Sequence, residues 1–213
     1  MAEDLKDKIL ETASALFDGR GVRDVTIEDV CRALSISKKT FYQYYSQKED
    51  LVFDVIQSRF ETRKQFLSSL CHGKNAIEIL GVASTLMAQK HWIDKESRMA
   101  SDVMKYYPET FRKSTALRES DIRKTFVSYV LQGQEEGFFQ KDIDVEAQAL
   151  VFGFIHKGIA KYGSGNDSIP GKKIAHKRLC SAFAKTVGLT LFTEEGWEAY
   201  HELFKDQLYE KNE

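Results

Sequence analysis

The chain has 213 residues, of which 42% are hydrophobic and 30% are charged, and its formal net charge is −1, a composition typical of a water-soluble globular protein with one or two domains. No apolar run approaches the roughly 18 residues that cross a membrane, and the N-terminus lacks the apolar core of a signal peptide, so we expect a cytoplasmic protein with no membrane partner. The odd count of three well-separated cysteines argues against a disulfide framework.

The first predicted element is an amphipathic helix over residues 5–18. Its apolar side chains, such as Leu5, Ile9 and Ala13, recur at helical spacing, and Gly19 and Gly21 follow it. We expect this helix to brace the next two, so its apolar stripe is structural and it is expected to make no contact with DNA bases.

Residues 26–45 predict two short helices joined by a tight turn. Thr26 is a suitable N-cap, with Asp29 three residues later in the place of the usual Glu or Gln of a capping box. The chain restarts at a second N-cap, Ser37, and we expect the second helix to continue to Tyr45. This arrangement is typical of a helix-turn-helix.

The second of these helices has the chemistry of a DNA-reading helix. Lys38, Lys39 and Thr40 lie on its first turn, where base contacts are made, and Phe41 can hold it on the first helix. Tyrosines 42, 44 and 45 can donate to phosphates, although three neighbours cannot share one helix face and at least one is expected in the core. A plain helical hairpin is the alternative, but it needs neither the basic turn nor the tyrosines.

Residues 8–56 resemble the DNA-binding region of the TetR family of transcriptional regulators. The resemblance is carried, in order and at the right spacing, by Leu16-Phe17 with Gly21, by Thr26-Ile27, by Thr40-Phe41-Tyr42-Gln43-Tyr44-Tyr45 and by Lys48-Glu49-Asp50-Leu51. Two positions depart from the family, which commonly has glycine where this chain has Ser35 and Lys39. The base preferences of the family are therefore not carried over.

The rest of the chain predicts helices and no strand, so we expect an all-α protein. A helix over residues 47–70, opened by a capping box from Ser46 to Glu49, is expected to link an N-terminal three-helix DNA-binding domain (1–46) to a larger helical effector-binding and dimerisation domain (47–213). Pro108 marks a break, Gly137 a helix end and Asp144 a cap. The further helices are expected over residues 76–92, 97–107, 110 or 114 to 136, 144–162, 172–192 and 193–210.

Two predicted helices near the C-terminus are candidates for a dimer interface. Residues 172–192 present an i, i+4 ridge that includes Leu179, Phe183, Val187 and Leu191, and small residues in 144–162 permit close helix approach. The resemblance implies a homodimer formed by these two helices, while the alternative is that the ridge serves the internal core. The final helix, 193–210, is expected either to cover the dimer edge or to cap the ligand pocket.

The resemblance also implies where the partners bind. Double-stranded DNA is expected at Thr26, Ser37, Lys38, Lys39, Thr40, Tyr42, Tyr44 and Lys48, the last as a phosphate contact. An apolar or aromatic small-molecule effector is expected among the middle helices, where flexible and aromatic side chains gather. Its predicted contacts are Met87, Trp92, Met104, Tyr107, Phe126, Tyr129, Phe152 and His156.

We therefore predict a ligand-responsive transcriptional regulator, a repressor that binds a palindromic operator as a homodimer and leaves it when an effector binds. The alternative is a helical small-molecule-binding or interaction protein without sequence-specific DNA binding. An enzyme is not expected, since the chain has no glycine-rich phosphate loop, nucleophile elbow or paired metal-ligand motif. No cofactor and no metal are expected.

Overall fold

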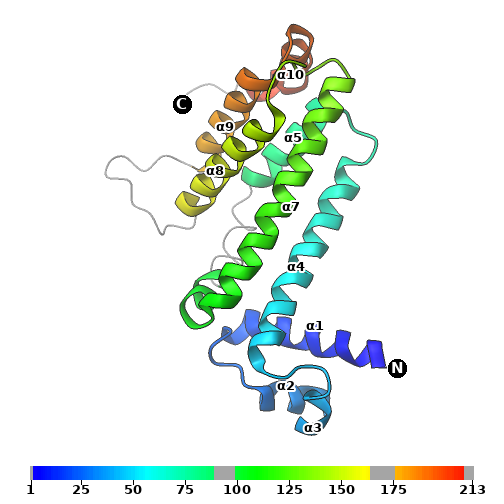
Figure 1. Ribbon diagram of the computed structural model, residues 1–213, viewed down its shortest axis with the longest axis vertical. Helices are drawn as coiled ribbons and strands as arrows, with labels where there is room; N and C mark the ends of the chain where they lie inside the picture. The colour runs from blue at the N-terminus through cyan, green and yellow to red at the C-terminus, as the bar shows by residue number, and fades with distance from the viewer. Residues whose placement is uncertain (1, 89–98, 164–175, 209–213) are drawn as a thin grey trace. The chain divides into compact units, whose positions relative to one another are not determined.

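The structure, a computed structural model, describes residues 2–88, 99–163 and 176–208. Within these ranges every regular element is a helix (Figure 1), apart from an isolated antiparallel bridge between Phe139 and Phe192. The predicted all-α fold is confirmed. The contacts divide the chain into two compact units, Met1–Phe66 with Asp94–Arg118 and Leu67–Ile93 with Glu119–Glu213.

The first unit is built on the N-terminal helices. It comprises α1 (Ala2–Arg20), α2 (Ile27–Leu34), α3 (Lys38–Phe41), the first part of α4 (Lys48–Cys71), a helical stretch over residues 99–106 and the start of α7 (Pro108–Glu135). Ile9 and Phe17 of α1 meet Phe41 of α3 in its core, together with Leu51 and Val55 of α4. Because the first half of α4 packs in this core, the contacts divide after residue 66, whereas the DNA-binding domain was expected to end at residue 46.

The two predicted caps of the helix-turn-helix are present, but α3 is shorter than expected. Thr26 caps α2 with a complete capping box, and the Ser37 side chain accepts from the backbone N–H of Thr40. The helix expected to run to Tyr45 ends at Phe41, and residues 42–44 form turns. Phe41 and Tyr45 are both buried, which holds this bent segment against the core.

Ser35 closes α2 in a left-handed conformation, with φ of 54°. Its backbone N–H donates to the carbonyl of Arg32 at 3.2 Å, which completes the turn between the two helices. A side chain with a Cβ is strained in this region of backbone space, whereas glycine enters it freely. The departure from glycine at this position is therefore a local strain in the turn.

Replacing Ser35 with glycine is expected to raise the free energy of unfolding by about 0.5–1 kcal/mol, because it removes the Cβ strain of the left-handed cap. The measurement is urea unfolding followed by circular dichroism. Gly19 lies in helical backbone with open space around it, so Gly19→Ser is a control that leaves the turn unchanged. An unchanged or lower midpoint for Ser35→Gly would mean that the serine turn is unstrained.

The predicted capping box of α4 did not form as expected. Glu49 accepts a hydrogen bond from the buried hydroxyl of Thr110 at 2.7 Å, rather than reaching back to Ser46. Thr110 lies in the first turn of α7, which begins at Pro108, where a missing N–H costs nothing. A contact across 61 residues has replaced the local one that the sequence suggested.

The second unit contains the end of α4, α5 (Ala76–Ala88), most of α7, α8 (Val145–Gly163), α9 (His176–Leu191) and α10 (Glu194–Leu208). The predicted cap at Asp144 is confirmed, since its carboxylate accepts from the N–H of Ala147 at 3.0 Å. Gly137 has φ of 83° and follows α7, as its predicted role required. Thr193 opens α10 by accepting from the N–H of Gly196 at 3.1 Å.

The ridge of α9 packs inside the second unit, which corrects its preferred assignment to the dimer interface. Phe183, Val187 and Leu191 are all at most 6% exposed and lie in one cluster with Phe126 of α7. The final helix joins the same cluster through Tyr200 and Phe204 and packs against α5. The ridge is core because α9 packs against α5 and α8 within the unit.

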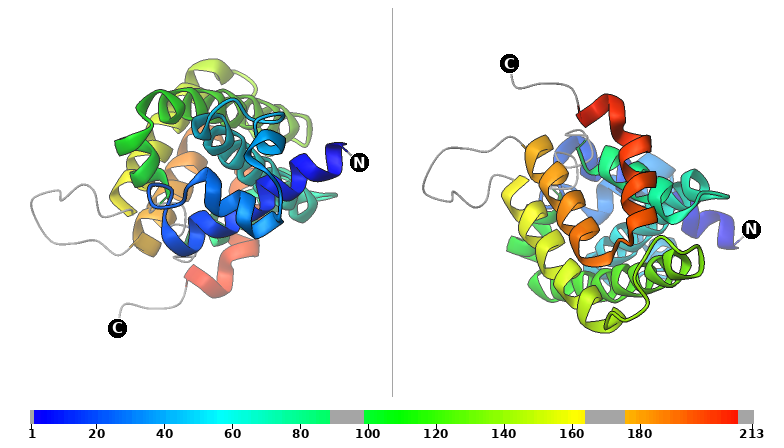
Figure 2. Two further views of the ribbon diagram at one scale, coloured as in Figure 1. Left: turned by 90° about the horizontal axis from the view of Figure 1, so that it is seen from below. Right: turned by 90° about the horizontal axis from the view of Figure 1, so that it is seen from above.

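The outer faces of α8 and α9 carry several exposed apolar side chains. These two helices run side by side (Figure 2). They leave large apolar side chains in solvent. Phe154 is 68% exposed and Leu189 is 72% exposed, while Leu150 and Val151 are each about half exposed. We refer to these four residues as the α8–α9 patch.

Candidate DNA-binding interface

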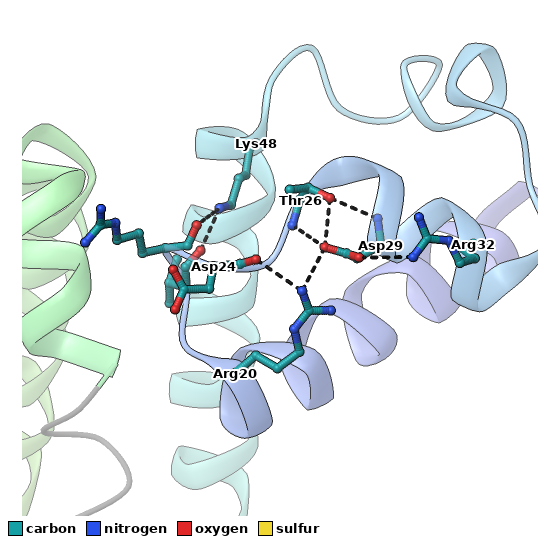
Figure 3. Close-up of polar contacts among 8 residues, drawn as sticks. Arg20, Asp24, Thr26, Asp29, Arg32 and Lys48 are labelled. Atoms are coloured by element: carbon teal, nitrogen blue, oxygen red, sulfur yellow. Dashed lines mark hydrogen bonds and ion pairs between the residues drawn. The ribbon is translucent and has the colours of Figure 1, made fainter.

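The start of α2 is fixed by reciprocal hydrogen bonds. The backbone N–H and the hydroxyl of Thr26 donate to Asp29 Oδ2 at 2.9 and 2.8 Å, and Asp29 N donates back to Thr26 Oγ1 at 3.2 Å (Figure 3). Arg20 of α1 adds an ion pair to the same carboxylate. The donors on Thr26, followed by Arg20, hold the pKa of Asp29 far below its usual range. Thr26 thus caps α2, and Asp29 anchors α2 to α1 through Arg20.

The polar side chains at the start of α3 are partly used within the helix. Ser37 Oγ accepts from Thr40 N at 3.0 Å and lies 2.8 Å from Thr40 Oγ1. Both hydroxyls can still accept from DNA, but their positions are set by each other. The hydroxyl pair is therefore rigid before any ligand arrives.

The tyrosines after α3 separate into core and surface, as the helix geometry predicted. Tyr45 is only 3% exposed, whereas Tyr42 is 50% exposed and Tyr44 is half-buried. Tyr42 follows Lys39 by three residues, so both side chains leave the same side of the segment. These two residues form the exposed edge of the DNA-reading segment.

The two lysines of α3 differ in their partners. Lys38 forms an ion pair with Glu28 of α2, which raises the pKa of Lys38 and lowers that of Glu28. Lys39 is exposed, and no ion pair involving it is found among residues 2–88, 99–163 and 176–208. The free positive charge on this helix is therefore carried by Lys39.

The Lys48 side chain is half-buried and packs against the protein. Its ammonium donates to the carbonyl of Val22 at 2.6 Å and to that of Arg23 at 3.3 Å, and lies 5.8 Å from the ring of Tyr107. Burial lowers the pKa of this ammonium. In Figure 3 the side chain reaches the turn between α1 and α2. Since an ammonium has three donors, one remains for the predicted phosphate contact.

Replacing Lys48 with methionine is expected to lower the free energy of unfolding by about 1–3 kcal/mol, because the carbonyl of the buried Val22 loses a charged donor. If the third donor meets a phosphate, the dependence of log K on log[salt] also becomes shallower by about one. Thermal unfolding and DNA titrations at several salt concentrations measure the two effects.

Lys8→Met is the control, since Lys8 lies on the exposed side of α1 and pairs with Asp4. It removes the same charge from the same unit without touching the turn. Full stability in Lys48→Met would contradict the anchoring role of Lys48, and an unchanged salt dependence would contradict its phosphate contact.

The helix-turn-helix segment matches a known family. A model of the bacterial regulatory proteins of the tetR family matches residues 9–55. The HTH-type transcriptional repressor KstR2 of Mycobacterium tuberculosis is 28% identical to the chain over 160 residues, covering 70% of this chain and 75% of that protein. Residues 9–55 therefore form a DNA-binding region of the TetR type. The chain is a DNA-binding transcriptional regulator, and the caps and turn described above form its helix-turn-helix.

Solved structures of transcriptional regulators share the fold of this chain. A transcriptional regulator from Cytophaga hutchinsonii superposes with a TM-score of 0.69 at 15% identity, over 87% of this chain and 97% of that one. A regulator from Saccharomonospora viridis in complex with choline gives 0.64 at 18% identity, over 90% and 100%. At such identities the likeness establishes the fold alone.

Four of the predicted effector contacts lie together in the second unit. The rings of Phe126 and Phe152 stack with centroids 4.1 Å apart, and Tyr129 and His156 each lie 6.0 Å from one of them. The Tyr129 hydroxyl is buried and has no hydrogen-bond partner among the described residues. Burial raises the pKa of Tyr129 far above its ordinary value.

The other predicted effector contacts are not gathered there. Met104 and Tyr107 belong to the first unit, where Met104 is half exposed and Tyr107 packs on the DNA-binding core. Trp92 and the side chain of Met87 lie outside the described residues. Helical periodicity cannot tell which unit a residue joins, because both units use the same amphipathic pattern.

Sequence reasoning missed two acidic residues of the interface. Glu28 pairs with Lys38, and its place on the helix before the basic turn was the signal that could have found it. Asp102 accepts from the N–H of Val22 at 3.2 Å, across 80 residues, and no local pattern marks such a contact. Together with Lys48, Asp102 fixes the turn between α1 and α2.

Proposed function

We propose that the chain is a ligand-responsive repressor that binds a palindromic operator as a homodimer. The observation that carries the proposal is the helix-turn-helix with a free Lys39 and an exposed Tyr42 at its reading edge. The relative KstR2 is named as a repressor, which supports this sign of regulation. We also propose a cytoplasmic location, where bacterial DNA lies, and no catalytic role.

The homodimer is proposed to form through the α8–α9 patch. Large exposed apolar side chains gathered on neighbouring helices mark interaction surfaces, and a two-fold axis lets one patch cover its own copy. Gly153 and Gly158 lie on α8 with open space beyond them, so a second helix can approach closely. The two reading helices would then sit ~34–36 Å apart and meet half-sites about 10 base pairs apart.

The effector is proposed to bind beside the aromatic side chains of α7 and α8. A flat apolar molecule suits the stacked rings of Phe126 and Phe152, and the buried Tyr129 hydroxyl offers a hydrogen bond to one polar atom. The regulator that holds choline has the same fold, which supports a ligand site in this architecture. An effector that binds the DNA-free conformation better would release the operator by a population shift.

The alternative, a helical binding protein without DNA specificity, is not favoured by the comparisons. The two proposals are separated by selecting bound duplexes from a random DNA pool with the purified protein at near-physiological salt. Enrichment of a palindrome with half-sites about one turn apart is the expected result. Salt-sensitive binding to every duplex without enrichment would favour the alternative.

A further inference from the structure

The polar groups on the first turn of α3 are not equally available to DNA. Ser37 and Thr40 engage each other, and Lys38 is paired with Glu28. In the described part of the unit, this leaves Lys39 as the side chain of the turn with no hydrogen bond or ion pair. Lys38 and Lys39 are neighbours on a helix and so point about 100° apart. The two lysines look equivalent in the sequence, but in the structure Lys38 has an ion-pair partner and Lys39 is exposed.

The partner of Lys38 comes from the other helix of the motif. Glu28 lies in the first turn of α2, and its side chain is 49% exposed, like that of Lys38 at 54%. The pair as a whole carries no net charge. Glu28 thus places a carboxylate beside the DNA-reading turn, in a surface that otherwise attracts phosphates.

We propose that Glu28 is a specificity-determining positioning residue: it holds Lys38 against α2, cancels its charge and leaves Lys39 as the cation of α3 that reads the bases. This inference deepens the proposed function and rests on it where it concerns DNA.

The physical reason lies in how positive charge acts on DNA. Each unpaired cation on the reading surface strengthens binding to every sequence by releasing one counterion, and this term carries no sequence information. Cancelling the charge of Lys38 reduces that general attraction while the base contacts of Lys39 stay. An exposed ion pair is weak and DNA can separate it, but the carboxylate remains and repels phosphates either way. Glu28 therefore raises the ratio of specific to non-specific affinity.

The test compares the wild-type protein with Glu28→Gln, Lys38→Met and the double variant that carries both changes. Binding is measured on the duplex enriched from a random pool and on a mixed-sequence duplex of the same length, at several salt concentrations. Glu11→Gln is the matched control, since it removes one exposed carboxylate from α1 of the same unit. Circular dichroism verifies that each variant is folded.

Glu28→Gln is expected to bind the mixed-sequence duplex about 5–10-fold more tightly, with a salt slope steeper by about one, so that discrimination falls. The double variant is the decisive one. If Lys38 makes no contact with DNA, removing both charges leaves the slope and the enriched sequence as in the wild type. A double variant with a slope shallower by about one, or with another preferred sequence, would overturn the proposal.

A second readout needs no DNA. In the free protein the Glu28 carboxylate, followed by nuclear magnetic resonance, is expected to titrate below the pKa of about 4.3 of an ordinary glutamate and to return toward it in Lys38→Met. An identical midpoint in both proteins would overturn the pairing. If the wild type enriches no duplex while the midpoint shifts, the proposed operator binding fails and the pairing stands.

Discussion

Replacing Phe154 with glutamate is expected to convert the proposed homodimer into monomers and to remove most of its affinity for a palindromic operator. Phe154 is 68% exposed and is the aromatic residue of the α8–α9 patch. A large aromatic residue at the centre of an interface contributes about 2 kcal/mol or more, so the dimer dissociation constant should rise by at least ~30-fold. Both copies carry the substitution, so a two-fold interface loses two phenylalanines and the dissociation constant rises further. Sedimentation velocity over a range of concentrations measures it.

Leu131→Glu is the matched control for this substitution. Leu131 is 48% exposed and lies on α7 of the same unit, outside the α8–α9 patch. It introduces the same charge at a similarly exposed leucine, and the dimer should persist. Dimers of Phe154→Glu at micromolar concentration, with monomers of Leu131→Glu, would place the interface on α7 instead.

Lys39→Met is expected to weaken operator binding by about 5- to 150-fold and to change the preferred base at one position of each half-site. A lysine that contacts a guanine edge contributes about 1–3 kcal/mol of discrimination, and Lys39 is the lysine of α3 with no ion pair in the described part of the unit. Methionine keeps the length of the side chain and removes the charge. Selection from a random pool, repeated with the variant, identifies the altered position.

A uniform loss across all sequences would show that Lys39 meets a phosphate and not a base. Lys8→Met again serves as the control for charge, because its salt bridge to Asp4 lies on α1. The two outcomes differ in the enriched sequence as well as in affinity, so the experiment separates positioning contacts from base contacts.

The residues that sequence analysis placed correctly act through short-range contacts. Thr26 and Asp29 are three residues apart, as are Ser37 and Thr40, and both pairs cap their helices as predicted. By the same local rules, Asp144 opens α8 and Gly137 follows the end of α7. Caps are predictable because donor and acceptor lie within one turn of the chain, so their geometry depends little on the rest of the protein.

The residues that sequence analysis misplaced act across the fold. Glu49 was expected to reach back to Ser46, but it accepts from Thr110, which brings α4 and α7 together. The α9 ridge with Phe183 was assigned by preference to a dimer, but the second unit uses it for its own core. An apolar ridge looks the same in a sequence whether it is covered by the same chain or by another copy.

The sequence by itself determined the helical fold, the helix-turn-helix and the family, because amphipathic periodicity and caps are local and their spacing is distinctive. Only the tertiary structure decided which charges are free. Lys38 meets Glu28 on another helix, and Lys48 donates to carbonyls more than 20 residues away, while Lys39 keeps its charge exposed. The physical reason is that an ion pair depends on the distance between two atoms in space. Neighbouring lysines of identical chemistry therefore acquire different roles only when the chain is folded.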